Sequence, residues 1–113
     1  MSEYEPYRAP GAADEARFRG GGEQDWRVVL EYSNRGDAKP PTKLDVVEET
    51  YPSRDAALVA AEEQALTYFP PDPWNVQKRT VLADGPDGFL VVLEGLTSTY
   101  HFRSRAMRFV AEA

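Results

Sequence analysis

The chain of 113 residues contains no cysteine, no isoleucine and a single histidine, His101. Without cysteine it can form no disulfide, no thiolate nucleophile and no Cys-based zinc site. The absence of cysteine fits a reducing compartment, so we expect a cytoplasmic protein. No apolar run approaches the roughly 18 residues that a membrane-spanning helix needs.

Positive charge is also scarce, because the net charge is −6. An acidic chain repels polyphosphate at long range, which argues against general nucleic-acid binding. Most of the basic residues are arginines, and together with the missing isoleucine this indicates GC-rich coding. A cluster of arginines is therefore weaker evidence for a site than it would be elsewhere.

Residues 1–22 differ in composition from the remainder of the chain. They carry Pro6, Pro10 and three consecutive glycines at 20–22, with scattered charge and no hydrophobic period. Such a segment cannot bury enough apolar area to offset its ordering entropy. We predict a disordered tail over residues 1–22 and a single domain over residues 23–113.

The hydrophobic pattern of the domain predicts five strands and one helix. Alternating apolar residues mark strands over residues 26–33 and 43–51, most simply antiparallel to each other. Residues 53–69 form the helix, with Ser53 as its N-cap. One face of the helix should pack on the sheet, and it carries Ala57, Leu58, Ala61, Ala65, Tyr68 and Phe69. Three further strands follow, over residues 74–83, 89–94 and about 97–110, with DGPDG as a hairpin turn.

The element order β-β-α-β-β-β predicts an α+β fold, in which an antiparallel sheet of about five strands packs on one helix. The strand at 89–94 is apolar on both faces, which favours a central position. A single helix covers only one face of a sheet. We expect Val29 and Val47 on the other face, together with Leu90 and Val92. Dimerisation, or curling of the sheet around a pocket, would cover this apolar area.

The final strand carries the most suggestive cluster of charge. His101, Arg103 and Arg105 alternate along it and therefore share one face, about 7 Å apart stepwise. Guanidinium groups bind carboxylates and phosphates bidentately, so these three residues are candidates for anion binding. The alternative is that the arginines solubilise an outer strand and pair with carboxylates on its neighbour. We favour this alternative.

Two tryptophans, Trp26 and Trp74, open predicted strands and are candidates for a pocket rim, although a core position is the simpler interpretation. Around His101 we find no motif for an orienting carboxylate or a nucleophile, so we predict neither a catalytic site nor a metal site. DGPDG lacks the lysine and the following helix of a nucleotide-binding loop. We therefore predict no cofactor.

Three hypotheses for function follow. In the first, the protein is a non-enzymatic binding or assembly module that self-associates, as a homodimer, through the uncovered sheet face. In the second, a curved sheet holds a small anionic or aromatic ligand near Arg103, Arg105 and Trp74. In the third, which we favour least, the final strand binds nucleic acid, with Tyr100 and Phe102 stacking on bases. We expect no membrane contact.

Overall fold

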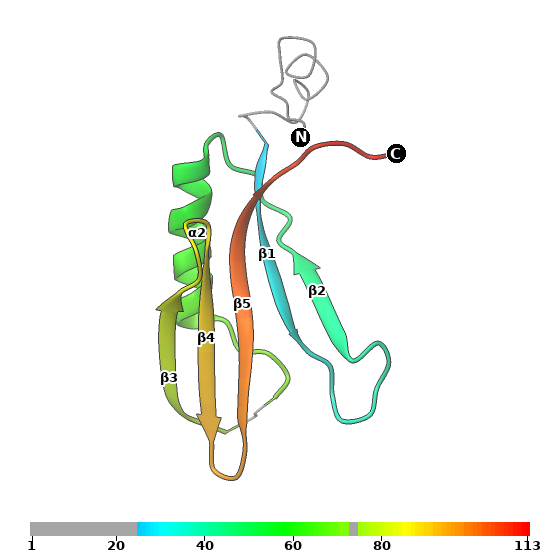
Figure 1. Cartoon of the computed structure of the whole chain (residues 1–113), viewed down its shortest axis with the longest axis vertical. Coiled ribbons are helices and arrows are strands. Elements are labelled where there is room, and N and C mark those ends of the chain that lie inside the picture. Colours follow the sequence, from blue (N-terminus) through cyan, green and yellow to red (C-terminus); the bar gives the residue numbers. More distant parts are fainter. Residues whose placement is uncertain (1–24, 73–74) are drawn as a thin grey trace.

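The computed structural model describes residues 25–72 and 75–113, which form one sheet and one helix (Figure 1). The elements are β1 (Trp26–Ser33), β2 (Thr42–Val46), α2 (Arg54–Thr67), β3 (Val76–Ala83), β4 (Gly88–Gly95) and β5 (Thr99–Arg108). The predicted α+β class and element order are confirmed. The predicted N-terminal tail, residues 1–22, lies outside the described residues, as does Trp74. In the described part of the chain, no helix is long and apolar enough to cross a membrane.

The strand order of the sheet is β2-β1-β5-β4-β3, and every neighbouring pair is antiparallel. Strand β5 is therefore the central strand, and the prediction that it is an outer strand is wrong. Its charged face is partly exposed to solvent because no described element covers the sheet on that side, and not because the strand lies at an edge. Strand β4 is internal, as its apolar faces predicted, although it is not the central strand.

Helix α2 begins where its cap predicts. The Ser53 side chain accepts a hydrogen bond from the Ala56 backbone N–H at 3.1 Å. The helix ends at Thr67, and the backbone of Tyr68 is extended, with ψ at 139°. Because the helical geometry has already ended, Phe69 leaves the buried face and is 69% exposed. The prediction that Phe69 packs on the sheet is therefore wrong.

The core lies between α2 and the middle of the sheet. Ala57, Ala61 and Ala65 are the buried helix residues, and they face strands β5, β1 and β4. Small side chains let the helix lie close to the sheet. Ser104 of β5 is fully buried beneath it, and its hydroxyl donates to the Ala61 carbonyl at 2.8 Å. The largest fully buried side chains belong to the sheet: Phe102, Leu30, Leu93, Val28 and Val91.

Strand β2 is shorter than predicted. It ends at Val46, and Tyr51 returns to the sheet only as an isolated bridge to Trp26. Val46 pairs with Val29, which places both residues on the face away from the helix. Alternation then turns Val47 to the helix side, where it packs against the core. Val47 was expected on the uncovered face, and that expectation is wrong because the register between β1 and β2 could not be derived from the sequence.

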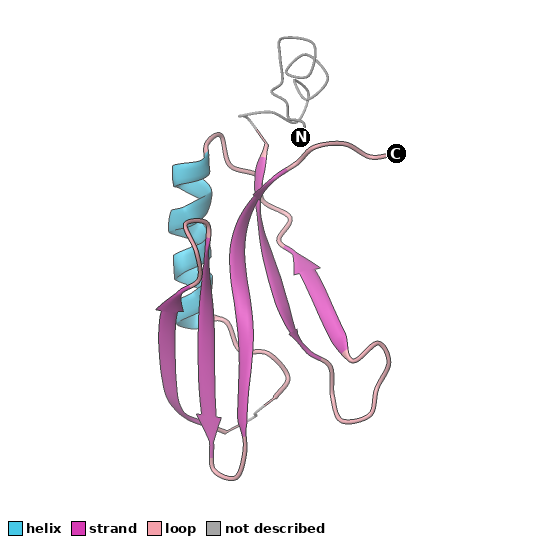
Figure 2. Ribbon diagram, viewed as in Figure 1, coloured by secondary structure: helices cyan, strands magenta, loops and turns pink. Residues whose placement is uncertain are grey.

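The sheet face away from α2 is here called the open face. Figure 2 shows a single helix behind the sheet, and among residues 25–72 and 75–113 no other element covers the strands. Side chains of the open face come from alternate positions of every strand. On β5 these positions are His101, Arg103 and Arg105, while Phe102 and Ser104 point into the core. The predicted separation of the two faces of β5 is confirmed.

Candidate functional site

The open face has apolar flanks and a polar centre. On one flank, Leu44 and Val46 of β2 are 64% and 50% exposed. On the other flank, Leu82 of β3 lies opposite Leu90 of β4 and is also exposed. Between them run β1 and β5, which carry the charged side chains. The open face is therefore neither uniformly apolar nor a single basic patch.

The two arginines of the predicted anion site already hold a carboxylate that belongs to the chain itself. Arg103 Nε lies 3.2 Å from Asp84 Oδ2, and Arg105 Nη2 lies 2.7 Å from the same oxygen. Asp84 follows β3 and begins the predicted hairpin turn, whose backbone closes through Asp84 N–H to Gly88 O at 2.9 Å. The structure thus brings Arg103 and Arg105 together at a carboxylate, and His101 is not part of that cluster.

Gly88 makes this arrangement possible. It pairs with Arg105 across the β4–β5 ladder, and the arginine side chain passes directly over it. A Cβ at position 88 would lie 2.7 Å from Arg105 Cγ and 3.1 Å from the Ser104 carbonyl oxygen. Only glycine therefore leaves room for Arg105 to reach Asp84 along this path.

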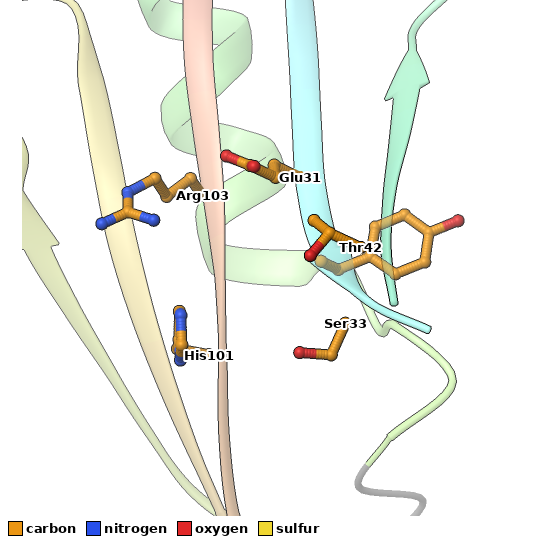
Figure 3. Close-up of a pocket in the computed structure, with 6 residues that line it drawn as sticks. Glu31, Ser33, Thr42, His101 and Arg103 are labelled. Carbon is orange, nitrogen blue, oxygen red and sulfur yellow. The ribbon is translucent and has the colours of Figure 1, made fainter. Parts of the chain in front are cut away.

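A shallow hollow of about 100 Å³ lies on the open face beside this cluster. Three adjacent strands form it, and its lining residues are Glu31, Tyr32, Ser33, Thr42, His101 and Arg103. Figure 3 shows the Ser33 and Thr42 oxygens and the His101 ring around a common space, with the Glu31 carboxylate above that space, over β5. In the same view the Arg103 guanidinium is turned away from that space, over β4.

Glu31 has an unusual position in this hollow. It pairs directly with Arg103 across the β1–β5 ladder, where opposite charges normally attract. Arg103 pairs with Asp84 instead. Among the described residues the Glu31 carboxylate forms no hydrogen bond and no ion pair. The hollow consequently contains the half-buried carboxylate of Glu31. The basic residue opposite it, Arg103, forms its ion pair with Asp84.

Trp26, a candidate for a pocket rim, lies at a different place. It borders a wider hollow of about 310 Å³ together with Pro52 and residues 53–55 at the start of α2. Trp26 is half-buried and neither lines the hollow beside His101 nor approaches Arg103. The predicted combination of a tryptophan with the arginines is therefore not formed by Trp26, and Trp74 lies outside the described residues.

Two groups on the helix side of the sheet have shifted pKa values with a structural cause. Burial lowers the pKa of Arg79, whose guanidinium donates to the Ala65 and Tyr68 carbonyls at 2.9 and 2.8 Å. Burial, and then a hydrogen bond with Tyr32, raises the pKa of Tyr68. Arg79 thus satisfies backbone carbonyl groups at the C-terminal end of α2. These groups stabilise the packing of the helix and do not reach the open face.

Sequence reasoning missed four residues of the site, namely Glu31, Ser33, Thr42 and Asp84. Glu31 and Ser33 fall on the polar side of β1 in the alternation, but their meeting with His101 depends on β1 pairing with β5. Asp84 stands four residues before Gly88, and a hairpin places two such residues opposite each other. That spacing was the available signal. Among the described residues, no group of three or more histidines and carboxylates could hold a metal ion.

Comparison with known proteins adds no further constraint on the site. No protein-family model matches the chain, and no curated protein or solved structure matches it. The function must therefore be inferred from the open face itself.

Proposed function

We propose that this protein is a cytoplasmic, non-enzymatic assembly domain that forms a homodimer by stacking the open faces of two sheets. The observation that supports this most strongly is the exposed apolar area on both flanks of a face that no described element covers. Exposed apolar area of this kind commonly marks an interaction surface. Leu44 and Val46 of one copy can meet Leu82 of the other when two sheets stack about a two-fold axis along the strands.

The charge of the open face also favours a second copy as its partner. At its centre, Arg103 and Arg105 are balanced by Asp84 and Glu31, although the whole chain carries −6. Two copies of a neutral face do not repel each other. The outer surface of α2 differs, because Asp55, Glu62 and Glu63 outnumber Arg54 on that helix. Two copies would repel each other through α2, so the open face is the better surface for self-association.

The size of the open face is sufficient for a specific dimer. Five strands about 4.8 Å apart, each about eight residues long at about 3.3 Å per residue, give a face on the order of 600 Å². Two such faces would bury on the order of 1,200 Å², at the lower end of the range for specific interfaces. We therefore expect a dimer of moderate stability that dissociates on dilution.

The structure gives less support to the nucleic-acid hypothesis. Phe102, one of the two aromatic residues expected to stack on bases, is fully buried under α2. The arginines of β5 are neutralised in part by Asp84, so they provide little free positive charge for phosphates. We favour self-association for these reasons.

The test is the molar mass of the wild type and two variants, measured by light scattering from low to high micromolar concentration. The wild-type mass should rise from 12.7 kDa toward twice that value. Leu44→Glu places an unpaired charge in the proposed interface twice, once per copy, and should weaken dimerisation by at least about tenfold. Val59→Glu is the matched control, because Val59 is 68% exposed on α2 and should leave dimerisation unchanged.

Two results would overturn the proposal. One is a wild-type mass of 12.7 kDa at every concentration tested. The other is a dimer that Val59→Glu disrupts and Leu44→Glu does not, since this would place the contact on the helix. Both residues are exposed, so circular dichroism should show that each variant stays folded.

A further inference from the structure

The hollow beside His101 presents hydrogen-bond acceptors from three strands to one small volume. Glu31 and Ser33 come from β1, Thr42 from β2 and His101 from β5. A carboxylate, two hydroxyl oxygens and a neutral imidazole nitrogen can all accept hydrogen bonds. In Figure 3 the Ser33 hydroxyl points toward His101, and the Glu31 carboxylate reaches toward β5 above them.

Asp84 does not line the hollow, but it affects the charge there because it pairs with Arg103. Arg103 would otherwise pair with Glu31, its direct neighbour across the ladder. The Arg103–Asp84 ion pair at 3.2 Å holds the guanidinium on the β4 side instead. The Glu31 carboxylate therefore has no ion pair among the described residues, whereas the charge of Arg103, which also lines the hollow, is partly neutralised by Asp84. A cation that enters the hollow thus meets the better electrostatic partner.

From these contacts we infer that the hollow binds a primary ammonium group. Such a group is compact, positively charged and carries three N–H donors. The Glu31 carboxylate can take one of these hydrogen bonds as a charge-assisted contact, and Ser33, Thr42 and His101 can accept the others. An anion would be repelled by the Glu31 carboxylate at close range. A guanidinium group is planar, so its N–H donors do not match acceptors that surround a central point.

This site uses one copy of the chain and does not depend on dimerisation. The ammonium group can belong to a small alkylamine or to a lysine side chain of a partner protein, because both present the same –NH₃⁺. The hollow lies on the open face, so a bound ligand would also lie close to the proposed dimer interface.

The test uses the imidazole NMR signals of His101, which are unambiguous because the chain has one histidine. Wild-type protein is titrated with methylammonium at constant pH and ionic strength, at a concentration where its mass is that of the monomer. The His101 signals should shift saturably. Tetramethylammonium, which has the same charge and no N–H donor, should produce no saturable shift. A peptide with an acetylated N-terminus and one lysine, and the same peptide with that lysine side chain acetylated, then show whether an ammonium group on a polypeptide can enter the hollow. Only the first should shift the His101 signals saturably.

The variant Glu31→Gln keeps the size of the side chain and removes its charge. It should weaken methylammonium binding by about tenfold or more, since a charge-assisted hydrogen bond is lost. Glu94→Gln is the matched control, because Glu94 belongs to β4 and does not line the hollow. Equal shifts with tetramethylammonium, or unchanged binding in Glu31→Gln, would overturn the inference. Neither result would bear on the dimer, which is measured by mass.

Discussion

At the scale of single residues, one carboxylate and one glycine decide what the arginines of β5 can do. Asp84 accepts from both Arg103 and Arg105, and Gly88 leaves the space that Arg105 crosses to reach it. This shared ion pair is half exposed, so its contribution to stability is small. Its larger effect is to direct Arg103 away from Glu31.

Gly88→Ala tests this arrangement. The added Cβ would lie too close to Arg105 Cγ and to the Ser104 carbonyl oxygen, so Arg105 must leave its path to Asp84. We expect a loss of about 1–3 kcal/mol in the free energy of unfolding, measured by urea denaturation. In an Arg105→Ala background the same glycine substitution should cost less, because the closest contact is already absent. If Gly88→Ala lowers the free energy of unfolding equally in both backgrounds, contact with Arg105 is not the reason that position 88 requires glycine.

The sequence predicted correctly on which face of the sheet the side chains of β5 lie. It did not predict which carboxylate the arginines contact. Alternation along β5 placed His101, Arg103 and Arg105 on one face, and Phe102 is buried on the other. The identity of the carboxylate that the arginines hold depends on which strand lies beside β5 and on the path of a hairpin. Pairing between distant segments is not encoded in any local pattern, so Glu31 could not be identified. The hairpin spacing between Asp84 and Gly88 was the local signal available for Asp84.

At the scale of elements, the packing of α2 depends on small residues at its contact with β5. Ala61 is fully buried, and its carbonyl accepts from Ser104 directly below. The helix was the best predicted element because its cap, its alanine face and its proline-rich end are all local signals. Strand positions were predicted less well, since the charge pattern of β5 resembles that of an edge strand.

Ala61→Leu tests the close approach of helix and sheet. The larger side chain has no space above Ser104, so the helix must shift and the free energy of unfolding should fall by about 1–3 kcal/mol. Val59→Leu, on the exposed side of the same helix, should change it by no more than about 0.5 kcal/mol. Urea denaturation of both variants provides the comparison. A similar effect of the two substitutions would mean that α2 is not closely packed at Ala61.

At the scale of the whole molecule, a two-layer arrangement leaves half of the sheet without cover among the described residues. The sequence predicted this from its single helix, and the structure confirms the layers. The combination of apolar flanks with a charge-balanced centre became visible only once the strand order was known. Self-association through that face remains the central proposal.

The most direct test of that proposal uses the chain's lack of cysteine. Val59→Cys provides one thiol for a nitroxide label on the outer side of α2, and pulsed electron paramagnetic resonance then measures the distance between labels in a dimer. Stacked sheets lie about 10 Å apart and a helix is about 10 Å wide, so face-to-face dimers separate the helix axes by roughly 30 Å. We predict distances of about 30 Å or more, with an amplitude that grows with protein concentration. Helix axes only about 8–10 Å apart, as in direct helix packing, or the absence of any coupling between labels at high concentration, would contradict it.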